Sequence, residues 1–198
     1  MKALVLVDLQ VDFFPGGALE VKTGNKILPV INQLMESPFD KIVATKDWHP
    51  GGHISFASTH HKQPGEMIEV NGVLQILWPD HCVQGTKGAE FAPGWPNERV
   101  DKVFLKGTLK EIDSYSTFYD NLHLHATGLA DYLKQHKIDT IYLAGLTTEY
   151  CVAYSALDAR RLGFNVFVVR EGCEGVELEK GNVDKAYNEM KAAGVQII

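Results

Sequence analysis

Short, continuous apolar runs rich in Val, Ile and Leu recur along the chain. Runs of this kind are typical of parallel strands that are buried on both faces, because such strands show no alternation of polar and apolar positions. The six runs are residues 3–7, 42–45, 103–105, 140–144, 166–169 and 195–198. They predict the strands of one sheet.

Most of these runs are separated by stretches with helical spacing. Residues 25–36, for example, place Ile27, Ile31 and Leu34 on one helical face. Further helices are predicted at residues 127–136, 151–162 and 183–193. Alternating strands and helices predict an α/β fold of three layers, with a mainly parallel six-stranded sheet and helices on both of its faces.

The stretch from residue 49 to residue 98 does not follow this alternation. It is rich in Gly, Pro, His and Trp, and only fragments such as residues 66–70 have the pattern of a strand. So long a loop inside a compact domain is usually either functional or disordered, and its aromatic content argues against disorder. We therefore expect a functional loop region within a single domain that spans residues 1–198.

Polar side chains follow the predicted strands. Asp8 follows the first strand, Asp47 and His49 the second, Lys106 the third, and residues 147–151 the fourth. In open α/β sheets, ligands bind at the carboxyl ends of the strands. These residues should therefore meet in one crevice.

Cys151 stands at the start of a predicted helix. The positive end of the helix dipole would acidify its thiol, and the free N–H groups there could hold an oxyanion. The alternative is a small buried hydrophobe, which is the common fate of a free cysteine, and position alone leaves both interpretations open. Cys82 and Cys173 lack such a helix start, and we interpret both as structural.

Asp8 and Lys106 are charged residues at the ends of apolar strands. Asp8 could take the thiol proton of Cys151, while Lys106 holds the carboxylate and balances its charge. Each residue alone fits a structural ion pair equally well. The three together favour catalysis, because shifted titratable groups concentrate at active sites.

A second group of residues favours a metal ion. The motif D-W-H-P-G-G-H carries Asp47, His49 and His53, and W-P-D-H-C carries His81. A carboxylate two residues from an imidazole, with a distant further ligand, suits zinc, iron or manganese with open positions for substrate. The alternative is a set of ordinary surface histidines.

Phe13, Trp78 and Tyr115 lie near these groups in the sequence and could enclose a flat ring. Each could equally be a loop aromatic that fills core space.

Composition narrows the classes of partner. The net charge of −6 and the absence of Lys/Arg clusters argue against nucleic acid and anionic membranes. The apolar runs are too short to cross a bilayer. Three cysteines do not form a disulfide framework, which favours a reducing, cytoplasmic setting.

Five linked blocks resemble the nicotinamidase/pyrazinamidase family of isochorismatase-like hydrolases. The blocks are V-D-L-Q-V-D-F-F-P-G-G-A-L, A-T-K-D-W-H-P-G-G-H-I-S-F, W-P-D-H-C-V-Q-G-T, F-L-K-G and G-L-T-T-E-Y-C-V, in this order from Lys2 onward. The resemblance implies that Asp8 is the general base, Lys106 the catalytic lysine and Cys151 the nucleophile. It also implies the metal ligands, which are Asp47, His49 and His81, with His53 as a further ligand in some members.

The resemblance extends to the substrate. It implies a cis peptide bond at Leu146–Thr147, an oxyanion hole from the N–H groups of Thr147 and Cys151, and pocket walls formed by Phe13, Trp78 and Tyr115. The implied reaction is hydrolysis of nicotinamide, and also of pyrazinamide, through a cysteine thioester, in NAD salvage. One divalent ion, zinc in the first place and iron or manganese otherwise, would face the ring nitrogen.

Two rival functions remain open at this stage. One is another cysteine amidohydrolase of the superfamily that acts on a carbamoyl or ureido substrate. The other is a non-catalytic binding or receiver-like module, which also places Asp and Lys at strand ends. Exposed sheet edges in such folds leave room for a homo-oligomer.

Overall fold

A six-stranded sheet forms the centre of the computed structural model, which describes residues 1–70 and 72–198. The strand order is β5-β2-β1-β6-β7-β8, and every neighbouring pair is parallel. The strands are β1 (Lys2–Val7), β2 (Lys41–Asp47), β5 (Lys102–Lys106), β6 (Thr140–Leu146), β7 (Asn165–Glu174) and β8 (Gln196–Ile197). Each of the six apolar runs corresponds to one of them, so the predicted sheet is confirmed.

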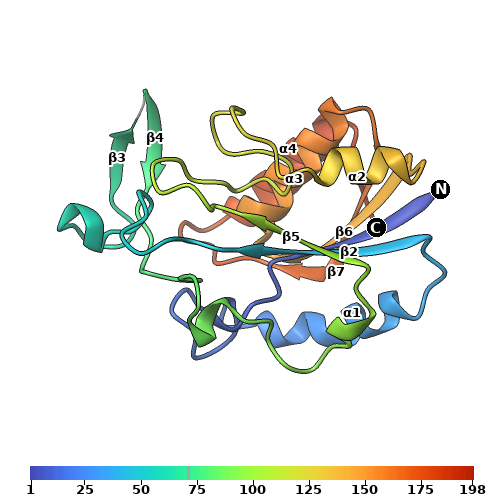
Figure 1. Cartoon of the computed structure of the whole chain (residues 1–198), viewed down its shortest axis with the longest axis horizontal. Helices are drawn as coiled ribbons and strands as arrows, with labels where there is room; N and C mark the ends of the chain where they lie inside the picture. Colours follow the sequence, from blue (N-terminus) through green and yellow to red (C-terminus); the bar gives the residue numbers. More distant parts are fainter. Residues whose placement is uncertain (71) are drawn as a thin grey trace.

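Helices cover both faces of this sheet (Figure 1). The helix α1 (Leu28–Met35) lies on one face, and α2 (Leu129–Gln135), α3 (Ala153–Arg161) and α4 (Asn182–Ala192) lie on the other. Successive residues of β1 alternate between two cores: Val5 packs with the three-helix layer, and Leu4 packs with the α1 layer. The chain thus has the three layers that its sequence predicts.

Two helices begin differently from the prediction. The expected helix at residues 25–36 starts as a 3-10 turn, Gly24–Ile27, before α1. Pro29 stands in the first turn of α1, where its missing N–H costs no helical hydrogen bond. The helix expected to begin at Cys151 starts earlier, as a π-helical turn, Thr148–Val152, which leads into α3.

The long segment between β2 and β5 folds over the carboxyl ends of the strands. It contains a separate antiparallel hairpin, β3 (Met67–Val70) and β4 (Val73–Ile76), which projects away from the main sheet (Figure 1). The strand fragment predicted at residues 66–70 is therefore confirmed, whereas β4 was not predicted. Isolated bridges between His49 and Val83 and between Phe56 and Trp78 hold the segment together.

The carboxyl ends of β1, β2, β5 and β6 bring the candidate residues to one edge of the sheet. Both termini lie toward the opposite end of the molecule (Figure 1). No helix within the described ranges is long and apolar enough to cross a membrane.

Candidate active site

Three residues far apart in the sequence meet at this edge. Asp8 follows β1, Lys106 ends β5, and Cys151 lies in the π-turn after β6. The Nζ of Lys106 lies 2.9 Å from Oδ2 of Asp8 and 3.3 Å from Sγ of Cys151. All three side chains are buried. The predicted convergence of acid, ammonium and thiol is therefore present in the fold.

The two carboxylate oxygens of Asp8 have different partners. Its Oδ1 accepts a hydrogen bond of 2.6 Å from Oγ1 of Thr45. Its Oδ2 faces the ammonium of Lys106, 2.9 Å away. The backbone of Asp8 is left-handed, with φ of 50°, a conformation that is uncommon outside glycine and concentrates at functional sites.

Burial and the neighbouring charges shift the pKa values of Asp8 and Lys106. It raises the pKa of Asp8 above its ordinary value, although Lys106 pulls in the opposite direction. Burial alone would lower the pKa of Lys106, but Asp47 and Asp8 raise it well above its usual range. Lys106 is therefore a permanent cation, and Asp8 is a carboxylate with increased affinity for a proton.

The expectation of an acidified Cys151 is wrong for this resting state. Burial raises the pKa of its thiol well above the usual value, Lys106 lowers it, and Asp8 and Asp47 raise it further. The helix-start effect inferred from the sequence does not outweigh the loss of solvent and two nearby carboxylates. Cys151 therefore keeps its proton until a reaction partner accepts it.

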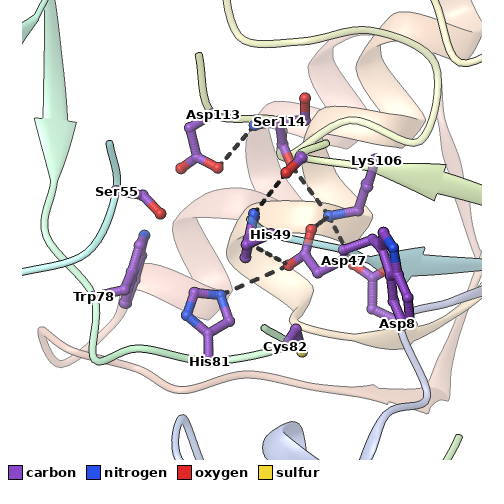
Figure 2. Close-up of polar contacts among 12 residues, drawn as sticks. Asp8, Asp47, His49, Ser55, Trp78, His81, Cys82, Lys106, Asp113 and Ser114 are labelled. Carbon is purple, nitrogen blue, oxygen red and sulfur yellow. Dashed lines mark hydrogen bonds and ion pairs between the residues drawn. The ribbon is translucent and has the colours of Figure 1, made fainter. Parts of the chain in front are cut away.

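A second cluster adjoins the first through Asp47, the last residue of β2. Its Oδ1 lies 2.5 Å from Nζ of Lys106, while Oδ2 lies 3.7 Å from Nε2 of His49 and 3.8 Å from Nε2 of His81 (Figure 2). Ligands bound about 2.1 Å from one ion lie roughly 3–4 Å apart, so these three residues fit one divalent metal ion. Burial alone would raise the pKa of Asp47, but Lys106 and His49 lower it well below its usual range, which keeps the ligand anionic.

Backbone carbonyls fix the orientation of both imidazoles. Nδ1 of His49 lies 2.9 Å from the Gly107 oxygen, and Nδ1 of His81 lies 2.8 Å from the Pro79 oxygen. If each Nδ1 carries the proton, both Nε2 atoms are free to bind a metal. Gly107 has φ of 61°, and a Cβ there would lie 2.3 Å from Cε1 of His49, so this close approach requires glycine.

His53 lies next to this triad rather than in it. Its ring stacks on His49 with a centroid distance of 4.2 Å, and its Nδ1 lies 2.7 Å from Oγ of Ser55. Its Nε2 lies 3.4 Å from the oxygen of Ile112. Burial, with His49 nearby, lowers the pKa of His53 to about 4, so the ring is neutral at pH 7.

One pocket connects the two clusters, and Asp47, His49, His81 and Cys151 all line it. Its lining includes all three aromatic residues inferred from the sequence, which are Phe13, Trp78 and Tyr115. Nε1 of Trp78 donates a 3.1 Å hydrogen bond to the hydroxyl of Tyr115. Thr147 and Cys151 also line the pocket, and the Leu146–Thr147 peptide bond is cis, as the resemblance implies.

Four further lining residues were not proposed as pocket residues from the sequence. They are Leu19, Asp113, Tyr150 and Val176. Tyr150 stands beside Cys151 in the sequence, so its neighbourhood was a usable signal. The other three lie in irregular segments. There, neither the spacing of apolar residues nor the end of a strand indicates which way a side chain points.

The model of the family described as "Isochorismatase domain" matches residues 2–198. A nicotinamidase of Acinetobacter baylyi is 46% identical over 197 residues, which cover 99% of this chain and 91% of the relative. A solved structure described as a nicotinamidase pyrazinamidase of Acinetobacter baumanii matches with a TM-score of 0.96 and 45% identity, covering 100% of this chain and 95% of that one.

Two other similar structures contain ligands. The yeast nicotinamidase bound to the inhibitor nicotinaldehyde has a TM-score of 0.94 and 32% identity, covering 100% of this chain and 99% of that one. The pyrazinamidase of Pyrococcus horikoshii in complex with zinc has a TM-score of 0.79 and 36% identity, covering 100% and 98%. The three-layer fold therefore has counterparts among proteins whose solved structures contain nicotinaldehyde or zinc.

Proposed function

The chain belongs to the isochorismatase family, and on this premise we propose that it hydrolyses nicotinamide to nicotinate and ammonia with Cys151 as nucleophile. The proposal rests mainly on the contact of Lys106 with both Cys151 and Asp8. This contact lies beside a pocket that is also lined by Asp47, His49 and His81, which we call the metal triad. A non-catalytic binding module would have no use for this combination. The match over residues 2–198 also supports a single catalytic domain.

In the first step the thiol of Cys151 attacks the amide carbon. The S–H bond breaks as the C–S bond forms, and the proton passes to Asp8, whose raised pKa favours its uptake. Lys106 stabilises the charge on sulfur and on the carboxylate during this transfer. Because both pKa values are raised, the thiol loses its proton only when the electrophile is in place.

The tetrahedral intermediate carries a negative oxygen. The N–H groups of Thr147 and Cys151 are the proposed donors to it, since both residues line the pocket. Collapse of the intermediate breaks the C–N bond, and the proton held by Asp8 leaves with ammonia. The products of this half-reaction are free ammonia and a thioester of Cys151.

Water completes the cycle. Asp8 takes a proton from water as its oxygen attacks the thioester carbon, and the C–S bond then breaks. The proton passes from Asp8 to the sulfur, which regenerates the thiol. The acid that leaves keeps the other proton of the water and ionises to nicotinate in solvent. Nicotinate released in this way would serve NAD salvage.

Asp47, His49 and His81 would hold the metal ion. When bound, the ion supplies a Lewis-acidic contact for a ring nitrogen, and zinc is the first choice, with iron and manganese as alternatives. The residues themselves fit this role, because they offer one carboxylate oxygen and two imidazole nitrogens toward one point. The zinc-bound relative supports the assignment.

Phe13, Trp78 and Tyr115 would enclose the ring. Aromatic walls favour a flat substrate and hold its carboxamide toward Cys151. The same walls accept any small aromatic amide with a suitably placed ring nitrogen, so we include pyrazinamide as a substrate.

Ammonia release from nicotinamide tests the proposal, with nicotinate measured in parallel. The wild-type protein should release both in equal amounts, and Cys151→Ala should release neither. Cys173→Ala is the matched control, because Cys173 is also free and buried but does not line this pocket, and it should keep its activity. Substantial turnover by Cys151→Ala would overturn the assignment of the nucleophile.

A panel of carbamoyl and ureido compounds separates the remaining rival. The metal triad favours an aromatic substrate with a ring nitrogen over these compounds, because carbamoyl and ureido groups offer no such ring. Hydrolysis of the panel without hydrolysis of nicotinamide would overturn the proposed substrate and leave the proposed nucleophile intact.

A further inference from the structure

Asp113 is a buried carboxylate in the pocket wall that the proposed reaction does not use. It lies in the loop after β5, two residues before Tyr115, and only 4% of it is exposed. Its Oδ1 accepts a 2.8 Å hydrogen bond from the N–H of Ser114, and its Oδ2 accepts a 3.0 Å hydrogen bond from Nε2 of Gln75. Among the described residues it has no ion-pair partner within 4.0 Å.

The charges around the pocket do not balance without a further cation. Asp8, Asp47 and Asp113 are three buried carboxylates, and Lys106 contacts the first two. A buried carboxylate is unfavourable unless a cation or several hydrogen bonds compensate it, and Asp113 has two hydrogen bonds from neutral donors. One divalent ion would bring the sum of these charges to zero.

Asp113 lies close to the metal triad without belonging to it. Each pair among a carboxylate oxygen of Asp113, a ring nitrogen of His49 and a ring nitrogen of His53 lies within 4.8 Å. Figure 2 shows Asp113 and Asp47 on different sides of His49. His81 and Trp78 line the same pocket as these residues. The triad therefore has one carboxylate, Asp47, inside it and a second beside it.

We propose that Asp113 is a positioning residue for the metal centre: it supplies, from outside the ligand set, the second negative charge that a dication requires. The inference rests on the metal site of the proposed function. Carboxylates next to the ligand set tune the affinity of a site and the orientation of its imidazoles.

Gln75 gives the β3–β4 hairpin a role in the same arrangement. It is the buried residue of β4, and its amide contacts Asp113 and lies 3.4 Å from the hydroxyl of Tyr115. Gln75 is a buried polar side chain in a hairpin whose other strand residues are exposed or half-buried, and it holds the carboxylate in one orientation. The hairpin is thereby connected to the metal site.

Zinc binding by the metal-free full-length protein tests the proposal, measured by calorimetry and repeated with manganese. Asp113→Asn should bind either ion about 10–100-fold more weakly, which is the usual effect of removing such a partner. Asp131→Asn removes the same charge from the exposed surface of α2 and should bind as the wild type does. Gln75→Leu should lie between the two, because the carboxylate stays but loses one donor.

Thermal unfolding distinguishes positioning from a structural role. The melting temperature of metal-free Asp113→Asn should equal or exceed that of the wild type, because a buried negative charge that has hydrogen bonds but no ion-pair partner is gone. The rise in melting temperature on adding zinc should shrink. Unchanged zinc affinity in Asp113→Asn, with or without a lower melting temperature, would overturn the inference.

Different results would overturn the proposed function and the inference about Asp113. A wild-type protein that binds neither ion would overturn the metal site and this inference together. Loss of zinc affinity in Asp113→Asn, in a protein that does not hydrolyse nicotinamide, would support the inference and overturn the proposed substrate.

Discussion

Asp47 and Lys106 form a 2.5 Å ion pair through one oxygen of the carboxylate, and the other oxygen of Asp47 faces two imidazoles. A single side chain thus connects the ammonium of the proposed catalytic cluster (Asp8, Lys106 and Cys151) to the proposed metal site. Since Lys106 also contacts Asp8 and Cys151, a change at this lysine affects both clusters.

Lys106→Met tests this coupling. The variant keeps the length of the side chain but leaves Asp8 and Asp47 without their cation. We expect a fall in amide hydrolysis of at least ~100-fold and a loss of about 3–5 kcal/mol in the free energy of unfolding, measured by ammonia release and by urea denaturation. Lys102→Met, at an exposed position of the same strand, should change neither. Near-normal activity of Lys106→Met would contradict the role given to the ammonium.

Asp8→Asn should change stability in a pH-dependent way in metal-free protein. The pKa of Asp8 is raised above its ordinary 3.8, so between 3.8 and the folded pKa the folded state binds more protons than the unfolded state. The stability of the wild type relative to Asp8→Asn should therefore fall as pH rises above about 4. Urea denaturation of both proteins at acidic and neutral pH measures this difference.

Asp47→Asn is a control for which the pH dependence of stability should have the opposite sign. The pKa of Asp47 is lowered below 3.8, so its stabilising contribution is present above 3.8 and is lost as pH falls through the folded pKa. Replacing Asp47 with Asn should lower the free energy of unfolding most at neutral pH and little in strong acid. Parallel pH profiles for the two variants would refute the assigned pKa directions.

Metal addition should stabilise the protein through His81. At a free ion concentration of 100 times the Kd, binding contributes ~2.7 kcal/mol, which corresponds to a rise in Tm of roughly 5–11 °C for a chain of this size. His81→Ala should show a much smaller rise, measured by calorimetry with zinc. His61→Asn, at an exposed left-handed position outside the triad, should behave as the wild type does.

Gly107→Ala should disturb the same site by steric contact. The added methyl would lie 2.3 Å from Cε1 of His49, so the imidazole must move, and we expect zinc affinity to fall by about tenfold or more. Gly65→Ala is a matched control, because Gly65 also has a positive φ, of 90°, but has open space around it. The control should lose only about 1–2 kcal/mol of stability and keep its zinc affinity. Equal zinc affinity in both variants would contradict the need for close approach at residue 107.

The strands and the residues at their ends could be predicted from the sequence because both follow from local patterns. Apolar runs define parallel strands, and parallel strands place their carboxyl ends together, so Asp8, Lys106 and Cys151 had to meet. The resemblance favoured the catalytic interpretation of these residues over the structural one, and it implied the cis peptide bond at Leu146–Thr147 that the structure contains.

Other features depend on how irregular segments fold, and no local pattern encodes that. In the sequence, Asp113 looks like any other polar loop residue. Its partner Gln75 is 38 positions away in the chain. The predicted lowering of the Cys151 pKa is wrong for a related reason. A helix start is visible in the sequence, whereas the burial that outweighs it arises only from tertiary packing.

The placement of the termini has a practical consequence. Met1 precedes β1 at the amino end of the sheet, and Ile198 hydrogen-bonds with Val168 and Arg170 in the middle of β7. Both ends of the chain lie away from the crevice (Figure 1). An affinity tag or a surface linker attached at either end would extend from the far side of the molecule. Tethered protein should therefore admit substrate and metal as freely as protein in solution.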